Sequence, residues 1–220
     1  MALTKILIAD DHPVFLFGLK SVLGSLENCV IDNVATDGKT AFSLIRDTKP
    51  DIAILDITMP VLNGIEVTRK INMIKSTTKV IILTMHKDES IFNLAFDLGA
   101  VGYVLKDNAA TDIVSCINSV SNDKTFVSPQ IDSFYVNRNS NSYPSDLSLI
   151  KTLTDAEKVV LKEITENKSS IDIADKLNVS NKTIQNHRFN ICKKMKLEGV
   201  NSLLSYALTN KNLIHLILSK

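Results

Sequence analysis

The chain has 220 residues, of which 45% are hydrophobic, and a formal net charge of +1 at pH 7. This length predicts one large or two small domains, and the apolar content suffices for packed cores. The first residues lack a basic stretch followed by a long apolar core, and no apolar run approaches membrane-spanning length, so we expect a cytoplasmic protein that does not bind membranes. Cys29, Cys116 and Cys192 are few, odd in number and far apart, which argues against a disulfide framework and a CxxC metal site.

The charge is unevenly distributed along the chain. Residues 1–121 carry 11 Lys and Arg against 14 Asp and Glu, a net charge of −3. Residues 147–220 carry 12 against 7, a net charge of +5. An acidic front half and a basic back half predict two domains with different partners, the back one binding a polyanion.

Strand and helix patterns alternate through residues 1–121. Short apolar runs predict five strands, at 6–9, 30–35, 52–55, 80–83 and 101–105. Apolar residues at helical spacing predict helices between and after them, at 14–26, 39–46, 64–74, 88–98 and 109–120. Five strand–helix units in succession predict an α/β fold, a doubly wound five-stranded parallel sheet with helices on both faces.

The rest of the chain divides at its change in composition. Residues 122–148 are rich in Ser, Asn and Asp and contain Pro129 and Pro144, so we expect a linker with one short helix near 130–137. Residues 149–220 show only helical patterns, which predict a small all-α domain with helices at 154–166, 169–177, 181–195 and 201–208. The apolar tail 213–218 would pack either on its own domain or on a partner subunit.

The polar residues at the ends of the predicted strands are Asp10 and Asp11, Asp56, Thr84 and Lys106. In a parallel sheet these ends share one edge, where open α/β folds bind their ligands. Three carboxylates held close together repel one another and call for a cation, and Mg²⁺ prefers oxygen ligands. Taken singly, each residue could instead cap a strand or form a surface ion pair.

Such a site suits phosphoryl transfer to a carboxylate. Asp56 directly follows four consecutive apolar residues and is the candidate nucleophile, because an aspartate can form an acyl phosphate. The Thr84 hydroxyl, Lys106 and the metal would neutralise the charge of the phosphoryl oxygens.

Four motifs surround these residues: Ile8 to Pro13 (IADDHP), Leu55 to Pro60 (LDITMP) with Gly64, Leu83 to His86 (LTMH) and Gly99 to Asp107 (GAVGYVLKD). These motifs resemble the receiver domain of bacterial response regulators, of the NarL/FixJ family in particular. The resemblance implies a flavodoxin-like fold and Asp56 as phosphoacceptor from a sensor histidine kinase. It also implies a magnesium site made of Asp10 (mostly through water), Asp11, Asp56 and the Thr58 carbonyl.

The same resemblance implies a switch made by Thr84 and Tyr103, with Lys106 contacting the phosphoryl group. A phosphoryl oxygen on Asp56 would draw the Thr84 hydroxyl inward, and Tyr103 would turn into the vacated space. Thr58 and His86 flank the site and would influence dephosphorylation, although a histidine at the position of His86 is more often an ordinary solvated loop residue.

Residues 169–195 show a short helix, a tight turn and a longer helix, the pattern of a helix-turn-helix. The longer helix exposes polar and basic residues, which would also fit an ordinary helical bundle with a solvated face. The residues themselves, at 153–161, 173–180 and 183–195, resemble the LuxR-type DNA-binding domain. By that resemblance Gln185, Asn186 and Phe189 would face bases, and phosphates would be held by Lys182, Thr183, Lys193 and Lys194.

Four positions, Ala156, Asn167, Ile171 and Gln185, depart from what is usual in that family, where Arg, Gly, Lys and Lys are common. The expected function is a transcriptional regulator that dimerises and binds promoter DNA when Asp56 is phosphorylated. The alternative is a DNA-binding regulator that is independent of phosphorylation. A phosphatase with Asp56 as nucleophile would need an acid two residues later, and Thr58 cannot serve.

Overall fold

The computed structural model describes residues 3–140, 146–199 and 201–218, and the chain divides into two compact units, Met1–Ser142 and Tyr143–Lys220. The first unit contains a parallel sheet with the strand order β2-β1-β3-β4-β5-β6. Its strands are β1 (Thr4–Ala9), β2 (Cys29–Ala35), β3 (Ile52–Asp56), β4 (Lys79–Thr84), β5 (Ala100–Leu105) and β6 (Phe126–Val127). The doubly wound parallel sheet predicted from the sequence is confirmed.

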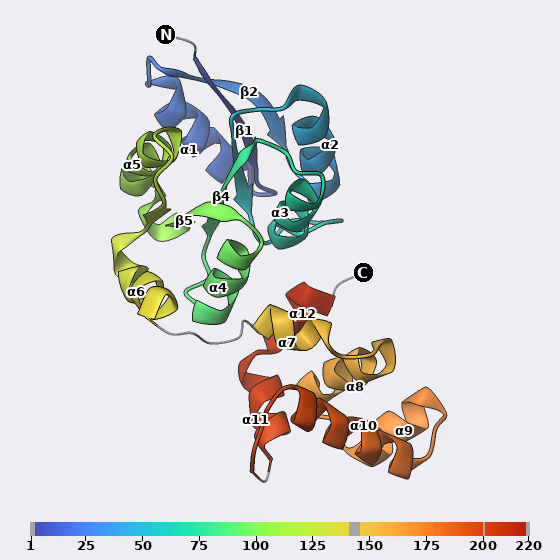
Figure 1. Ribbon diagram of the computed structural model, residues 1–220. Helices are drawn as coiled ribbons and strands as arrows, with labels where there is room; N and C mark the ends of the chain where they lie inside the picture. Colours follow the sequence, from blue (N-terminus) through green and yellow to red (C-terminus); the bar gives the residue numbers. More distant parts are fainter. Residues whose placement is uncertain (1–2, 141–145, 200, 219–220) are drawn as a thin grey trace. The chain divides into compact units, whose positions relative to one another are not determined.

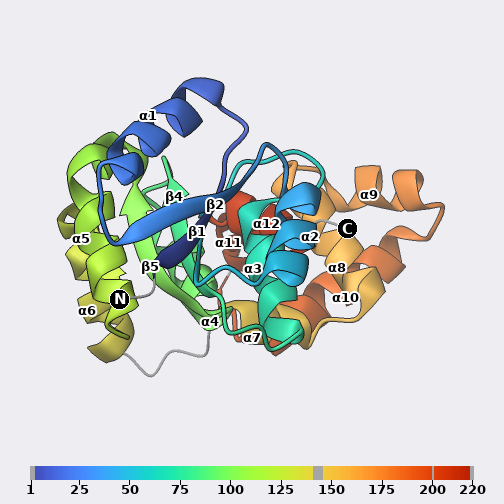
Figure 2. The ribbon, with the colours of Figure 1, turned by 90° about the horizontal axis from the view of Figure 1, so that it is seen from above.

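Helices cover both faces of this sheet (Figures 1 and 2). One face carries α1 (Pro13–Gly24) and α5 (Ala109–Ser121), and the other α2 (Gly38–Thr48), α3 (Gly64–Met73) and α4 (Glu89–Asp97). All five residues of β3 are buried, as expected for a central parallel strand covered on both sides. This layering brings the carboxyl ends of β1, β3, β4 and β5 to a single edge.

The segment predicted to be a linker differs from that expectation. Residues 126–127 form β6, a sixth strand that pairs in parallel with β5, one more than the sequence predicts. After the short 3-10 turn Pro129–Ile131, helix α6 (Asp132–Ser140) packs against α4. Most of the described part of residues 122–140 is therefore folded onto the first unit.

The described residues of the second unit form helices joined by turns: α7 (Asp146–Lys151), α8 (Asp155–Thr165), α9 (Ser170–Leu177), α10 (Asn181–Lys194), α11 (Ser202–Thr209) and α12 (Lys211–Leu218). Thr154, Ser169 and Ser180 cap the starts of α8, α9 and α10 with their hydroxyl groups. Asn167 has φ of 57°, which is consistent with its standing where a glycine is usual.

The apolar tail packs on its own unit. Leu213, Ile214 and Ile217 of α12 are buried, and α12 lies against α8. This answers the choice that the sequence left open for residues 213–218. Among the described helices, none combines the length and the apolar character that crossing a bilayer requires.

Candidate functional site

The strand-end residues predicted to converge do so around Lys106. The Lys106 Nζ lies 2.6 Å from Asp10 Oδ2 and 3.0 Å from Asp56 Oδ2. Asp10 and Thr84 are fully buried, and Asp56 and Lys106 are nearly so. A charged lysine is rarely buried unless it is paired, and here two carboxylates share the pairing. The ends of β1, β3 and β5 thus build one compact charged pocket.

Opposing effects act on the pKa of the Asp56 carboxylate. Burial raises its pKa above the usual range, Lys106 acts in the opposite direction, and the nearby Asp10 carboxylate raises it further. The two Oδ2 atoms that face Lys106 accept no well-directed hydrogen bond, although both are within ion-pair distance of its ammonium. Buried carboxylate oxygens in this condition favour a further cationic or hydrogen-bonding partner.

The donor set of the pocket fits a hard divalent cation. Single ligand atoms of Asp10, Asp11, His12 and Asp56 all lie within 4.8 Å of one another. Three carboxylates satisfy the preference of Mg²⁺ for oxygen. His12, which the sequence analysis did not include, has its Nδ1 2.8 Å from Asp11 Oδ1 and 3.1 Å from Asp10 Oδ1. Its position in the sequence, directly after the two aspartates, could have marked His12 as a further candidate ligand.

Thr58 and His86 meet at the rim of the pocket. Thr58 lies two residues after Asp56, and its Oγ1 is 3.4 Å from His86 Nε2. Both side chains are at least partly exposed, so this contact is open to solvent. The two residues that the sequence placed on either side of the site are therefore neighbours in space.

The predicted switch residues are connected through the backbone of His86. The His86 N–H donates a hydrogen bond to Thr84 Oγ1 at 3.1 Å, and the Tyr103 hydroxyl donates to the His86 carbonyl at 3.1 Å. Tyr103 is fully buried, and burial, followed by the charge of Asp88, raises its pKa. The inward position that the sequence analysis expected only after phosphorylation is already occupied in this structure.

In the second unit, α10 separates a buried side from an exposed one. Ile184 and Ile191 are buried in the helical core. The exposed side carries Lys182, Gln185, Asn186, Phe189 and Lys193, which follow one another at helical spacing. The Phe189 side chain on this side is 69% exposed. Five of the seven predicted DNA-contacting residues therefore share one accessible face.

The other two predicted contacts make bonds within the unit. Lys194 Nζ lies 2.6 Å from Glu157 Oε2, and Glu157 is only 3% exposed. Lys194 thus ties the end of α10 to the start of α8, and its contact with a DNA phosphate stays a prediction. The Thr183 hydroxyl is 2.8 Å from that of Ser180, so Thr183 takes part in capping α10.

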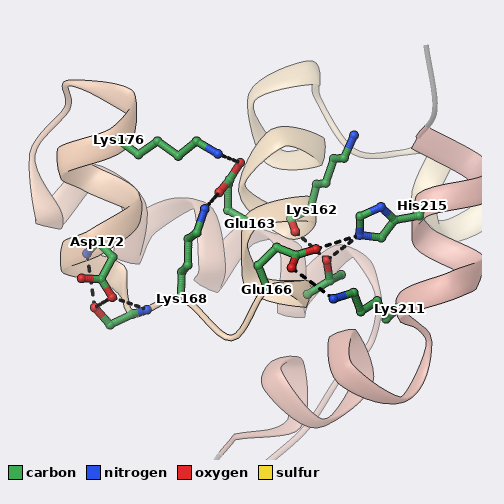
Figure 3. A network of polar contacts seen from close by, with 10 residues as sticks. Lys162, Glu163, Glu166, Lys168, Asp172, Lys176, Lys211 and His215 are labelled. Atoms are coloured by element: carbon green, nitrogen blue, oxygen red, sulfur yellow. Dashed lines mark hydrogen bonds and ion pairs between the residues drawn. The ribbon is translucent and has the colours of Figure 1, made fainter.

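A network of ion pairs holds α9 and α12 to the end of α8 (Figure 3). Glu163 binds Lys168 and Lys176, both at 2.6 Å, and Glu166 binds Lys211 at 3.1 Å and His215 at 3.2 Å. Burial by itself raises the pKa of Glu163, but the hydrogen bonds from the two lysines outweigh it, and the pKa is lowered. The network fixes the orientation of α9, the helix that precedes α10.

Comparison with known families assigns both units. The model of the response regulator receiver domain matches residues 6–118, and that of the bacterial regulatory proteins of the luxR family matches residues 151–207. The chain therefore belongs to the two-component response regulators of the NarL/FixJ family, in which a receiver domain precedes a LuxR-type DNA-binding domain. The family predicted from the motifs is confirmed, and with it the role of a DNA-binding transcriptional regulator.

Individual relatives extend over nearly the whole chain. The oxygen regulatory protein NreC of Staphylococcus epidermidis is 33% identical and covers 94% of this chain and 98% of its own length. The transcriptional regulatory protein LnrK of Bacillus subtilis is 33% identical over 87% of this chain and 90% of its own. Among solved structures, RcsB of Salmonella typhimurium has a TM-score of 0.61 at 26% identity, covering 92% of this chain and 98% of its own. The RcsB–DNA complex has a TM-score of 0.62 at 26% identity, covering 94% and 98%.

Proposed function

We propose that Asp56 accepts a phosphoryl group from a sensor histidine kinase, and that this modification promotes dimerisation and promoter binding through α10. The observation that carries the proposal is the buried Lys106 placed between Asp10 and Asp56, at 2.6 and 3.0 Å. This placement keeps the Lys106 ammonium beside the Asp56 carboxylate that would react. The Oδ2 atoms of Asp10 and Asp56 accept no well-directed hydrogen bond there.

In the transfer, the bond between phosphorus and the phosphohistidine nitrogen breaks and a bond to an Asp56 carboxylate oxygen forms. The reaction needs the ionised carboxylate, which Lys106 favours against burial. The Thr84 hydroxyl accepts from the His86 N–H and retains its own proton to donate to a phosphoryl oxygen. Asp56, Thr84 and Lys106 are buried, and at buried positions hydrogen bonds and charges act strongly on developing negative charge.

Mg²⁺ would be held by Asp11 and Asp56, with Asp10 acting mostly through water and the Thr58 carbonyl as a further ligand. When bound, the ion would neutralise part of the charge on the carboxylates and on the incoming phosphoryl group. The close approach of the carboxylate groups of Asp10, Asp11 and Asp56 supports this assignment.

For DNA, we assign base contacts to Gln185, Asn186 and Phe189 and phosphate contacts to Lys182 and Lys193, because these residues share the exposed face of α10. Thr183 and Lys194 would act mainly by fixing the helix, through Ser180 and Glu157. RcsB has been solved both with DNA and as two dimers bound to two parallel DNAs, which supports a dimeric DNA complex here.

The direct test is phosphorylation of the full chain by a small phosphodonor, acetyl phosphate, with Mg²⁺. Intact-mass measurement should show one added phosphoryl group, and light scattering should show a shift towards the dimer. Asp56→Asn should abolish both changes. Asp51→Asn is the matched control, because Asp51 is an exposed aspartate just before the opposite end of the same strand. Equal labelling of the Asp56→Asn variant would refute Asp56 as the acceptor.

A further inference from the structure

The segment that leads to α6 is anchored beside Tyr103. Strand β6 pairs with β5 so that Val127 lies opposite Tyr103, and the Ser128 N–H donates to the Tyr103 carbonyl at 3.0 Å. The fully buried Ser128 hydroxyl donates to Asp112 Oδ2 at 2.6 Å and accepts from the Leu105 N–H at 3.1 Å. The segment that enters α6 is thus anchored to β5, the strand that carries the switch tyrosine.

Polar contacts then fasten α6 to α4. The Arg138 guanidinium donates to Asp97 Oδ1 at 2.8 Å and to the Asn93 carbonyl at 3.2 Å. The Asn137 amide donates to Glu89 Oε1 at 3.1 Å. Three residues of α4 on successive turns therefore hold the second half of α6.

Aromatic contacts join the same two helices to the switch. The Phe92 ring, fully buried, lies 5.3 Å from the Tyr103 ring and 5.8 Å from the Phe134 ring, edge to face in both cases. Aromatic pairs in this geometry contribute stabilisation beyond the burial of their area. A single buried ring of α4 thus contacts the switch tyrosine on one side and α6 on the other.

We infer that α6 docked on α4 favours the inward position of Tyr103, so that docking of α6 and phosphorylation of Asp56 stabilise each other. This inference rests on the proposed function. Inward Tyr103 holds the His86 carbonyl, while the His86 N–H holds the Thr84 hydroxyl next to the phosphorylation site. Coupling between two such events is reciprocal: the factor by which docked α6 favours the phosphorylated site equals the factor by which that site favours docking of α6.

The coupling would also change the length of the connection between the two units. While docked, its nine residues belong to the first unit. Release would add them to the connection between the units, lengthening its reach by up to roughly 30 Å. Phosphorylation would therefore shorten the connection and raise the effective concentration of one unit near the other.

The test compares the full chain with a variant carrying Phe134→Ala and Arg138→Ala. Calorimetric titration with beryllofluoride and Mg²⁺ should show at least about five-fold weaker binding by the variant, the lower end of typical coupling between sites. In the unaltered chain, amide hydrogen exchange of residues 132–140 should slow when beryllofluoride is bound. The matched control carries Phe17→Ala and Arg46→Ala, the same two residue types at exposed positions of α1 and α2, and should bind beryllofluoride as tightly as the unaltered chain.

The outcomes separate the inference from the function on which it rests. Failure of the unaltered chain to bind beryllofluoride would contradict the proposed function. Equal binding by a folded variant, or exchange at residues 132–140 that beryllofluoride leaves unchanged, would overturn the coupling alone. Arg138→Gln, which removes the charge paired with Asp97 and keeps both aromatic contacts, should weaken binding in the same direction but less. It serves as the test should the double variant not fold.

Discussion

In the pocket, the single buried ammonium of Lys106 faces two buried carboxylates, those of Asp10 and Asp56. Like charges held this close raise the free energy of the unmodified pocket, and a cation lowers it. Burial, against the opposing effect of Lys106 and with a smaller contribution from the Asp10 carboxylate, holds the pKa of Asp56 above its usual range. A pocket with this excess of negative charge favours binding of a cation, and a phosphorylation site that uses a metal ion needs such a pocket.

Gly64 is a second residue whose identity follows from the pocket. A Cβ at this position would meet the backbone carbonyl of Asp56 well inside van der Waals contact. Gly64→Ala should therefore displace Asp56, lower the free energy of unfolding by about 1–3 kcal/mol, and reduce labelling by acetyl phosphate. Gly18→Ala is the control, because nothing lies within 4 Å of its Cβ and alanine favours a helix. Thermal unfolding should show opposite shifts for the two variants, and equal shifts would contradict the steric account.

On α10, two exposed residues should affect DNA binding in different ways. Asn186→Ala should cost about 1–3 kcal/mol at one base pair and relax sequence choice there, because a base-edge hydrogen bond is lost. Lys182→Ala should weaken binding to all sequences alike and reduce the salt slope by about 1. Affinities for a set of single-base operator variants at several salt concentrations distinguish the two. Uniform weakening by Asn186→Ala would make Asn186 a backbone contact.

At the scale of elements, the sequence predicted the parts with strong periodic patterns and missed those without. The strand-end residues Asp10, Asp56, Thr84 and Lys106 were predictable because parallel strands must end at one edge. Strand β6 could not be predicted from the sequence, because it has only two residues and forms by pairing with β5. Helix α6 was only partly predictable, since its apolar residues 134–136 are consecutive instead of following helical spacing.

The bond between Lys194 and Glu157 joins residues 37 positions apart and could not be foreseen from the pattern of α10 alone. Burial by itself raises the pKa of Glu157, but the hydrogen bonds from Lys194 and Thr154 outweigh it, and the pKa is lowered. A lowered pKa means that the stabilisation is complete above the ordinary value of 4.5 and is lost as the pH falls through the folded-state value. The second unit should therefore lose stability in mild acid.

Calorimetric scans of the full chain from pH 7 down to about pH 2, a range that passes through the lowered pKa of Glu157, would test this expectation. Glu157→Gln should lower the melting temperature of one transition at pH 7 and reduce its dependence on pH. Lys194→Met, which leaves the buried carboxylate without its partner, should cost up to about 1–3 kcal/mol, less where solvent screens the half-exposed lysine. Asp155→Asn should change little, because that carboxylate is fully exposed. A pH dependence that Glu157→Gln leaves intact would contradict the assignment.

At the scale of the whole molecule, the two units have opposite charge and separate chemistry. The acidic first unit carries the candidate phosphorylation site, and the basic second unit carries the exposed face of α10. A dimer would bring two such faces to paired half-sites, so that modest contacts add up to a stable complex. The chain thus separates the chemical signal from the recognition of DNA, and α6 lies on the segment between them.

The most direct measurement of this account is the affinity of the full chain for a DNA duplex with two half-sites, recovered by selection, with and without beryllofluoride and Mg²⁺. The account predicts tighter binding and a dimeric complex in the presence of beryllofluoride, and no change for the Asp56→Asn variant. The same affinity and the same mass of the complex under both conditions would contradict it, and would leave a DNA-binding regulator that does not depend on phosphorylation.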